Sequence, residues 1–203
     1  MTAEQVLAVA RKYIGYHEKA SNAKLEDFKA NSGSNNWNRF AAELDAVKSF
    51  YNGAKNGYAW CDIFVDCAFI ECFGIDLASK LTYQPKGGFS ALCSASANYY
   101  KANNAWFSTP AKGDQVFFYS GGGINHTGIV VDATGGLVVC VEGNSSDAVR
   151  KNTYRLCDSY IAGFGRPNWS IFESGGNEEG FFGNVIVRKM PRIGRKAEHE
   201  GVC

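Results

Sequence analysis

The sequence predicts an α+β fold, and two observations lead to it. Before Pro110, apolar side chains recur at helical spacing; after it, segments rich in β-branched and aromatic residues alternate with glycine-rich turns. Helices that precede a run of strands, instead of alternating with them, are typical of α+β proteins. In this chain, the N-terminal helices are expected to pack on an antiparallel β-sheet. The chain of 203 residues is long enough to bury the core of one such domain.

Helices are expected in four places before Pro110. The first opens at Thr2, which has capping-box spacing to Gln5, and the pattern stops at Gly15. The others are expected over residues 39–50, 61–73 and 90–102. The run that begins at Cys61 is apolar on nearly every side and has no turn signal before Gly74, so it is predicted to be a buried helix rather than a strand.

Strands are expected after Pro110, separated by turn signals. They cover residues 114–119, 126–133, 137–142 and 149–156, and residues 160–167 could add one more. The Gly135-Gly136 pair predicts a tight hairpin between the second and third of them. From about Ser170 the periodicity is lost, so we expect the domain over residues 1–169 and a linker or weakly ordered tail over residues 170–203.

Composition excludes several classes of protein. The net charge of +1 gives no strong field toward nucleic acid or acidic membranes, and no apolar run is long enough to insert into a membrane. The N-terminus has no basic region before its apolar residues, so no signal peptide is expected. We therefore expect synthesis in a reducing cytoplasm. The seven cysteines contain no C-x-x-C pair, and no P-loop or dinucleotide-binding pattern follows a strand.

Position distinguishes Cys61 from the cysteines that follow it. If a helix begins at Cys61, its thiol lies where unpaired N–H groups and the helix dipole favour an anion, which lowers a thiol pKa. Cys67 and Cys72 lie deeper in the same helix and gain no such help, so they are interpreted as core residues. Asp62 and Asp66, one turn apart, are interpreted as a solvated face or as N-terminal helix charges in preference to a metal pair.

A thiol nucleophile needs a base that is oriented by a third group. Of the three histidines, His126 begins a predicted strand directly after a glycine-rich turn, at an edge that the helix tip can reach. Pairing across the Gly135-Gly136 turn brings residues 126 and 142 within a few positions of each other. Glu142 is therefore expected to hold the imidazole tautomer and stabilise the imidazolium, with Asn144 in support.

Five segments, in this order along the chain, resemble a CHAP domain, the cysteine, histidine-dependent amidohydrolase/peptidase domain of the NlpC/P60 group. They are "AWCDIFV", "KGDQVFFY", "INHTGIVV", "VVCVEGNSS" and "IAGFGRP". The resemblance covers roughly residues 1–168 and implies a papain-like fold, with the cysteine at a helix N-terminus against the sheet that carries the histidine. It implies cleavage of an amide bond in bacterial peptidoglycan, either next to L-alanine on muramic acid or within the stem or cross-bridge peptide.

The resemblance also implies roles for individual residues. The catalytic set is Cys61 as nucleophile, His126 as base, Glu142 as orienting residue and Asn144 as an assisting group. The residues expected to contact the substrate are Tyr58, Trp60 and Asn125. Backbone N–H groups at the helix tip are expected to bind the oxyanion, with Tyr58 or Asn56 as a second donor. No metal or other cofactor is expected, because the acidic residues before Cys61 are scattered and do not form the calcium loop of some CHAP lysins.

Alternatives remain open at the level of biological role. CHAP domains are common in phage endolysins, which often lack a signal peptide and leave the cell through a holin pore, so action on the cell wall after release is expected. The same chemistry would serve an antibacterial effector or a wall-remodelling hydrolase. A module that binds wall peptide without cleaving it, or an intracellular cysteine protease acting on proteins, is a further alternative. The bond cleaved and the oligomeric state are left open by the sequence.

Overall fold

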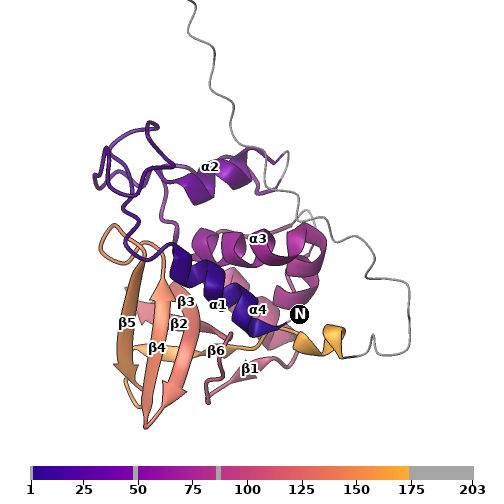
Figure 1. The fold of residues 1–203 in the computed structure, drawn as a ribbon. Helices are drawn as coiled ribbons and strands as arrows, with labels where there is room; N and C mark the ends of the chain where they lie inside the picture. Colours follow the sequence, from indigo (N-terminus) through magenta and orange to yellow (C-terminus); the bar gives the residue numbers. More distant parts are fainter. Residues whose placement is uncertain (1, 48–49, 86–87, 174–203) are drawn as a thin grey trace, which may run out of the picture.

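The computed structural model describes residues 2–47, 50–85 and 88–173. Figure 1 shows four α-helices, α1 (Ala3–Lys12), α2 (Arg39–Asp45), α3 (Cys61–Thr82) and α4 (Cys93–Ala102). The strands follow as β1 (Trp106–Phe107), β2 (Gln115–Ser120), β3 (Gly123–Thr134), β4 (Leu137–Glu142), β5 (Arg150–Arg155) and β6 (Ile161–Gly165), and a 3-10 helix, η1 (Trp169–Phe172), comes last. The predicted α+β class, with helices first and strands after, is confirmed.

The strands form one six-stranded sheet in the order β1-β6-β2-β3-β4-β5, and every neighbouring pair is antiparallel. The hairpin predicted at Gly135-Gly136 joins β3 to β4, and both glycines have positive φ, as the tight turn requires. The bounds of β4 agree with the expectation, whereas β3 begins three residues earlier than expected. Strand β1 was not expected, because two residues are too few to show a period.

Helix α3 is the longest element and is bent in the middle. Gly74 has φ 72° and ψ 167°, a conformation outside the helical region that separates two helical segments. The sequence correctly marks Gly74 as the end of the first segment, but the chain then resumes a helix as far as Thr82. The first segment is buried on nearly every side, as its composition predicts.

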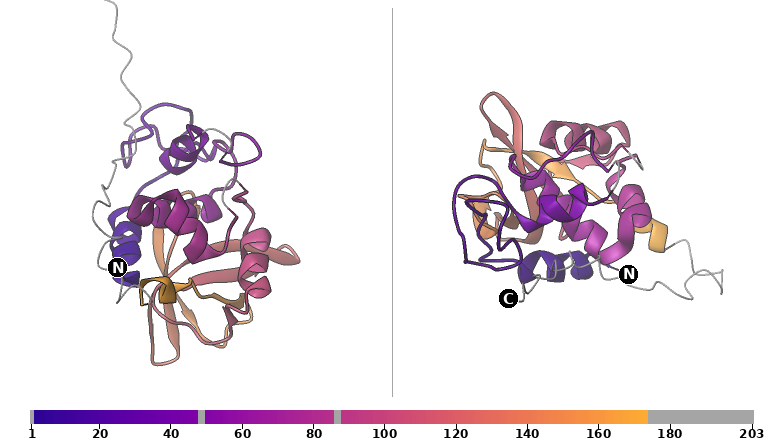
Figure 2. Two further views of the ribbon diagram at one scale, coloured as in Figure 1. Left: turned by 90° about the vertical axis from the view of Figure 1, so that its right-hand side faces the viewer. Right: turned by 90° about the horizontal axis from the view of Figure 1, so that it is seen from above.

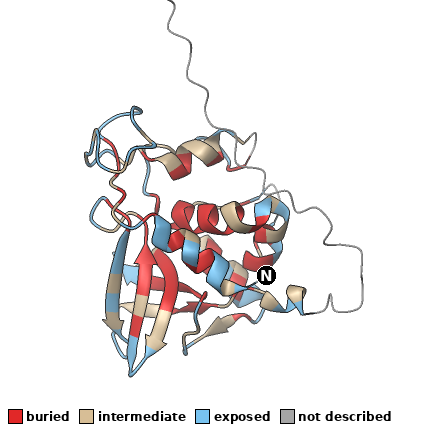
Figure 3. Cartoon of the chain, in the orientation of Figure 1, coloured by how far each residue is buried: buried red, intermediate tan, exposed pale blue. Residues whose placement is uncertain are grey.

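The helices pack on the sheet around a large hydrophobic core. Helices α1, α3 and α4 all contact β3, and α2 packs against α3 (Figures 1 and 2). Alternate residues of β3 serve the two faces of the sheet: Ile129 and Val131 join the core under the helices, while Val130 joins a second apolar cluster with Phe118 and Cys140. Figure 3 shows buried residues along α3 and the central strands.

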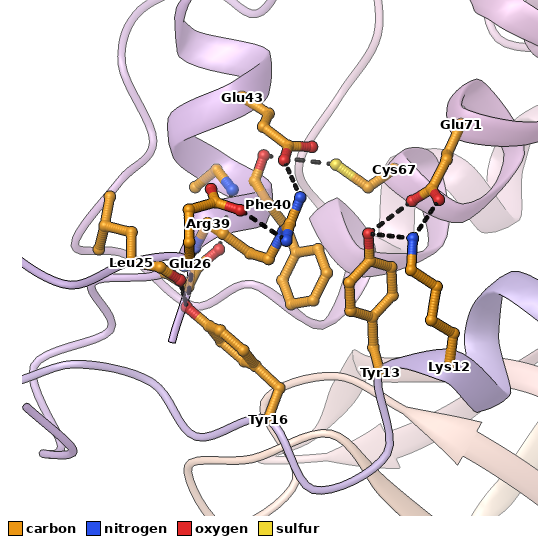
Figure 4. Close-up of polar contacts among 12 residues, drawn as sticks. Lys12, Tyr13, Tyr16, Leu25, Glu26, Arg39, Phe40, Glu43, Cys67 and Glu71 are labelled. Carbon is orange, nitrogen blue, oxygen red and sulfur yellow. Dashed lines mark hydrogen bonds and ion pairs between the residues drawn. The ribbon is translucent and has the colours of Figure 1, made fainter. Parts of the chain in front are cut away.

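A polar cluster ties together the three helices that surround this core (Figure 4). Tyr13, the residue that caps the C-terminus of α1, donates its hydroxyl proton to Glu71 of α3 at 2.6 Å. Arg39 of α2 pairs with Glu43 and, at 2.7 Å, with Glu26 of the preceding loop. Burial raises the pKa of Glu43 and opposes the lowering effect of Arg39. The first turn of α2 is thereby fixed against the loop that leads into it.

The packed part of the chain continues slightly beyond the expected boundary at residue 169. Trp169 stacks on Phe69 with ring centroids 6.0 Å apart, and Ile171 and Phe172 also pack against the main core. The rest of the predicted tail, residues 174–203, lies outside the described residues. None of the helices described here combines the length and the apolar composition that a membrane span requires.

Candidate active site

Cys61 is the first residue of α3, as the sequence predicts. The first intrahelical bond runs from the Phe64 N–H to the Trp60 carbonyl. The N–H groups of Cys61, Asp62 and Ile63 therefore have no acceptor within the helix, and they make the helix N-terminus a site that favours negative charge. Cys61 is 6% exposed, so its thiol is largely screened from bulk water. This position suits a thiolate.

His126 lies on β3 and contacts Glu142, the last residue of β4. Its Nε2 is 2.9 Å from Glu142 Oε2, and the Glu142 residue is 1% exposed. Ile129 pairs with Val141, so the register leaves Gly128, not His126, opposite Glu142. A Cβ on Gly128 would come within 2.5 Å of Glu142 Cγ. Glycine at position 128 thus gives the Glu142 side chain room to reach diagonally to His126.

Two residues that the sequence analysis missed hold the Glu142 carboxylate. Asn152 Nδ2 and the Tyr154 hydroxyl, both on β5, donate to Glu142 Oε2 at 3.0 Å and 3.2 Å. Residues two apart on a strand share a face, and β5 pairs in register with β4. Working out the β4–β5 pairing from the predicted strands would have placed Asn152 and Tyr154 on the face of Glu142. The other carboxylate oxygen of Glu142, Oε1, is buried and has no hydrogen-bond partner among the described residues.

The charges of the site favour a thiolate–imidazolium pair. Burial lowers the pKa of His126, but hydrogen bonds with Cys61 and Glu142 outweigh it and raise that pKa to about 9. Because Nε2 faces Glu142, the other ring nitrogen, Nδ1, is left for the thiol. The pKa of Cys61 is lowered well below its usual value, first by a hydrogen bond from Cys93 and then, against burial, by His126 and the Asp62 N–H.

Cys93 is a second thiol at the site, and no motif drew attention to it. It is the first residue of α4, and its Sγ lies 3.4 Å from Cys61 Sγ. Its pKa is raised, mainly by its hydrogen bond with Cys61 and by burial. The opposite shifts of the two pKa values favour a proton on Cys93 and a thiolate at Cys61. Only the tertiary packing of α3 against α4 brings the two residues together.

Asp62 and Asp66 are buried, which corrects the interpretation that they form a solvated face. Each is 1% exposed and accepts two hydrogen bonds from neutral side chains. The Asp62 donors are Ser96 and Gln115, and the Asp66 donors are Tyr51 and Gln84. Burial raises the pKa of both carboxyls, that of Asp66 to about 7. The pair anchors α3 to its surroundings beneath the thiol.

Asn144 and Trp60 do not take the roles expected of them. Asn144 Nδ2 donates to Glu18 Oε2 at 3.2 Å and to Asn36 Oδ1 at 2.7 Å, so its side-chain N–H groups are directed to the loop before α2. Trp60 is fully buried, and its Nε1 donates to the same Glu18 oxygen at 2.8 Å. Through Glu18, both residues join the segment between α1 and α2 (residues 13–38, here the N-terminal excursion) to the site. Because Trp60 is fully buried, it is not placed to contact a substrate. A buried Glu18 was not foreseeable from its polar surroundings in the sequence.

Tyr58 and Asn125, two of the residues expected to contact the substrate, are exposed. Tyr58 is 66% exposed in the loop before Cys61. Asn125 is exposed next to His126, and its carbonyl oxygen lies 3.9 Å from Cys61 Sγ. Asn56, expected as an oxyanion donor, instead accepts the Asn38 N–H through its side-chain oxygen at 2.9 Å. Asn125 thus lies beside the thiol, and Tyr58 is an exposed side chain of the loop that leads to it.

Within the described part of the chain, no group of three or more His, Cys, Asp or Glu side chains has the arrangement of a metal site. The chemistry that the site can perform with its own residues is nucleophilic. A thiolate, an imidazolium and an orienting carboxylate form a connected series from α3 to β3 to β4.

Comparisons with known proteins give little further information. No family model and no curated protein matches the chain. Among solved structures, the crystal structure of Ly7917 is similar with a TM-score of 0.45 and 13% sequence identity. The match covers 82% of this chain, which spans 62% of the length of that protein.

Proposed function

We propose that the protein is a cysteine-nucleophile hydrolase that cleaves an amide bond in bacterial peptidoglycan. The observation that carries the proposal is the series Cys61–His126–Glu142, in which Glu142 Oε2 lies 2.9 Å from His126 Nε2 and His126 lowers the pKa of the Cys61 thiol. Three dispersed residues meet with the roles that nucleophilic catalysis needs: an activated thiol, a base and an orienting group.

The proposed reaction begins with attack of the Cys61 thiolate on the amide carbonyl. The N–H groups of Cys61 and Asp62 at the tip of α3 stabilise the oxyanion. The His126 imidazolium gives its proton to the leaving amine, the C–N bond breaks, and a thioester forms. Neutral His126 then takes a proton from water, whose oxygen attacks the thioester, and the acid product leaves as the thiolate returns.

The nature of the substrate rests on the five segments that resemble a CHAP domain, since the catalytic series alone would suit any amide. We propose accordingly a papain-like arrangement, with peptidoglycan as the partner and either the muramoyl-L-alanine bond or a stem or cross-bridge bond as the target. The proposed contacts to the wall peptide are Asn125, which lies beside the thiol, and Tyr58, which is exposed in the loop before Cys61. An endolysin that reaches the wall after release from the cell is the proposed biological role.

The test is mass spectrometry of the fragments released from purified peptidoglycans of several chemotypes. Intact stem peptides with free N-terminal L-alanine would identify an amidase, and cut stem or bridge peptides an endopeptidase. Cys61→Ala should release none. Cys72→Ala is the matched control on the same helix, because Cys72 lies away from His126 at the edge of the core. Absence of products from every wall would refute the proposed function, and equal release by Cys61→Ala would refute the nucleophile.

A further inference from the structure

We propose that Cys61 and Cys93 form a dithiol that a hydroperoxide oxidises to a disulfide, which blocks the nucleophile until a thiol reductant restores it. The inference rests on the proposed function only where it takes Cys61 as the nucleophile. The disulfide itself follows from the arrangement of the two thiols. It makes the pair a modification site with hydroperoxides as its substrate class.

The first argument is proximity. The Sγ atoms of Cys61 and Cys93 are 3.4 Å apart, and both residues are free cysteines that are 6% exposed. A disulfide has an S–S distance of about 2.0 Å, so the sulfurs must approach by about 1.4 Å. Each cysteine is the first residue of its helix, and α3 and α4 pack against each other. Small side-chain rotations at two helix starts can supply this approach while the helices stay in place.

The second argument is the asymmetry of the two thiols. Cys61 accepts hydrogen bonds from Cys93, His126 and the Asp62 N–H, all of which lower its pKa. The pKa of Cys93 is raised, first by its hydrogen bond with Cys61, then by burial and by the charge of Asp62. Oxidant-sensitive cysteines combine a stabilised thiolate with a neighbouring resolving thiol. Cys61 provides the thiolate and Cys93 the resolving thiol.

The reaction balances with the hydroperoxide as the only oxidant. The Cys61 thiolate attacks one peroxide oxygen, the O–O bond breaks with departure of hydroxide or alkoxide, and Cys61 becomes a sulfenic acid. The negative charge that kept Cys93 protonated is now gone. Cys93 sulfur attacks Cys61 sulfur, the S–O bond breaks, and the hydroxide leaves with the Cys93 proton as water. A dithiol reductant reverses the step by thiol–disulfide exchange and is itself oxidised.

The other described cysteines have different surroundings. The Cys67 thiol lies 3.3 Å from the Phe40 carbonyl oxygen, which is its hydrogen-bond acceptor (Figure 4). Cys140 is enclosed in the second apolar cluster of the sheet, and burial raises its pKa and that of Cys67. Cys157 is exposed in the chain between β5 and β6. Cys157 therefore provides the control for oxidation that depends on exposure alone.

The experiment treats the full-length protein with hydrogen peroxide and reads the product by intact mass and peptide mapping under non-reducing conditions. We expect the wild type to lose about 2 Da and to yield a linked pair of peptides that contain Cys61 and Cys93. Wall hydrolysis should fall at least about tenfold and return after dithiothreitol. Cys157→Ser should behave like the wild type.

Cys93→Ser removes the resolving sulfur and keeps a hydrogen-bond donor. After peroxide treatment this variant should gain about 32 Da at Cys61. Its activity, compared with the rate of the same variant before treatment, should not recover after reduction. A wild type that gains about 32 Da without a linked peptide would overturn the inference, as would full recovery of Cys93→Ser. Peptide mapping of the wild type decides the question even if the variant does not fold.

The mass measurement separates this inference from the proposed function. A linked Cys61–Cys93 peptide in a protein that hydrolyses no wall would support the dithiol and refute the hydrolase. Wall hydrolysis that depends on Cys61, in a protein that never forms the linked peptide, would support the hydrolase and refute the dithiol.

Discussion

The first turn of α3 and the interior of α3 each contain a cysteine, and the two thiols have pKa values shifted in opposite directions. Cys61 and Cys67 lie on one helix and are both nearly inaccessible to water. The pKa of Cys61 is lowered, by hydrogen bonds from Cys93 and His126, whereas burial raises the pKa of Cys67, whose thiol donates to the Phe40 carbonyl. One thiol accepts hydrogen bonds and the other donates one.

Asp62 shows that proximity to the helix N-terminus does not by itself lower the pKa of an acidic side chain. It follows Cys61 in the same first turn, yet burial and the neighbouring Asp66 raise the pKa of its carboxyl. Its donors, Ser96 and Gln115, are neutral. His126, held by Glu142, lowers the pKa of Cys61 and is not among the causes that shift the pKa of Asp62. Nucleophile activation here depends on a partner from the sheet, and the helix dipole adds to it.

The largest expected difference is in alkylation of the two cysteines. At pH 7 iodoacetamide should modify Cys61 at least about 10³-fold faster than Cys67, because the thiolate is the reactive form and Cys67 is a buried thiol. Peptide mapping of a time course measures both rates in one sample. Comparable rates at the two positions would remove the distinction between the first turn and the interior.

The next largest effect is expected from Glu142→Gln. The carboxylate raises the pKa of His126, so its removal should lower that pKa below about 9. Activity, which needs the imidazolium as acid, falls as the pH rises through this pKa, and the alkaline limb of the pH–rate profile should move to lower pH. We expect about a 10²-fold loss of activity at pH 7. Asp132→Asn is the control: Asp132 is a half-exposed carboxylate on β3, the strand of His126, and its removal should leave the profile in place.

Gly128→Ala tests the space through which Glu142 reaches His126. The new Cβ would meet Glu142 Cγ at 2.5 Å and the Val141 carbonyl oxygen at 2.8 Å, so the carboxylate must move. We expect about tenfold lower activity and a loss of about 1–3 kcal/mol in unfolding free energy. Gly123→Ala on the same strand meets only the Asn125 side chain at 3.9 Å. If the two variants were equally active, the position of Glu142 would not depend on Gly128.

The smallest effect concerns the interior of α3. The pKa of Asp66 is raised from 3.8 to about 7 in the folded protein, mainly by burial. The folded state thus holds a proton that the unfolded state releases above pH 3.8, and this contribution to stability is lost as the pH rises from about 4 to about 7. Denaturant unfolding at several pH values should show a flatter profile for Asp66→Asn than for the wild type. Identical slopes would mean that Asp66 is ionised throughout.

The sheet and the approach of His126 to Glu142 are the parts that the sequence predicts best. Period-two segments between glycine turns give β4 its bounds, and the hairpin at Gly135-Gly136 brings His126 close to Glu142. The start of α3 is visible because an apolar run follows a polar loop abruptly at Cys61. Local signals, each spanning a few residues, are sufficient for these features.

The residues that the sequence does not reveal all act through tertiary contacts. Cys93 reaches Cys61 only through the packing of two helices, and Glu18 reaches Trp60 and Asn144 from an irregular loop. Trp60 stands beside Cys61 in the chain but points into the core, because the turn before a helix directs consecutive side chains to different sides. Neither spacing nor composition encodes such directions.

The links between the N-terminal excursion and the end of the sheet have a consequence for folding during synthesis. Glu18 bonds to Asn144, 126 residues later, and the Gly15 N–H donates to the Val149 carbonyl at 2.9 Å. Contacts of such long sequence separation form late, after the entropy of closing the intervening loop has been overcome. The nascent chain therefore cannot complete the surroundings of Cys61 until β4 and the turn after it have left the ribosome. We expect translation to deliver an inert polypeptide that becomes a catalyst only in its last stages of folding.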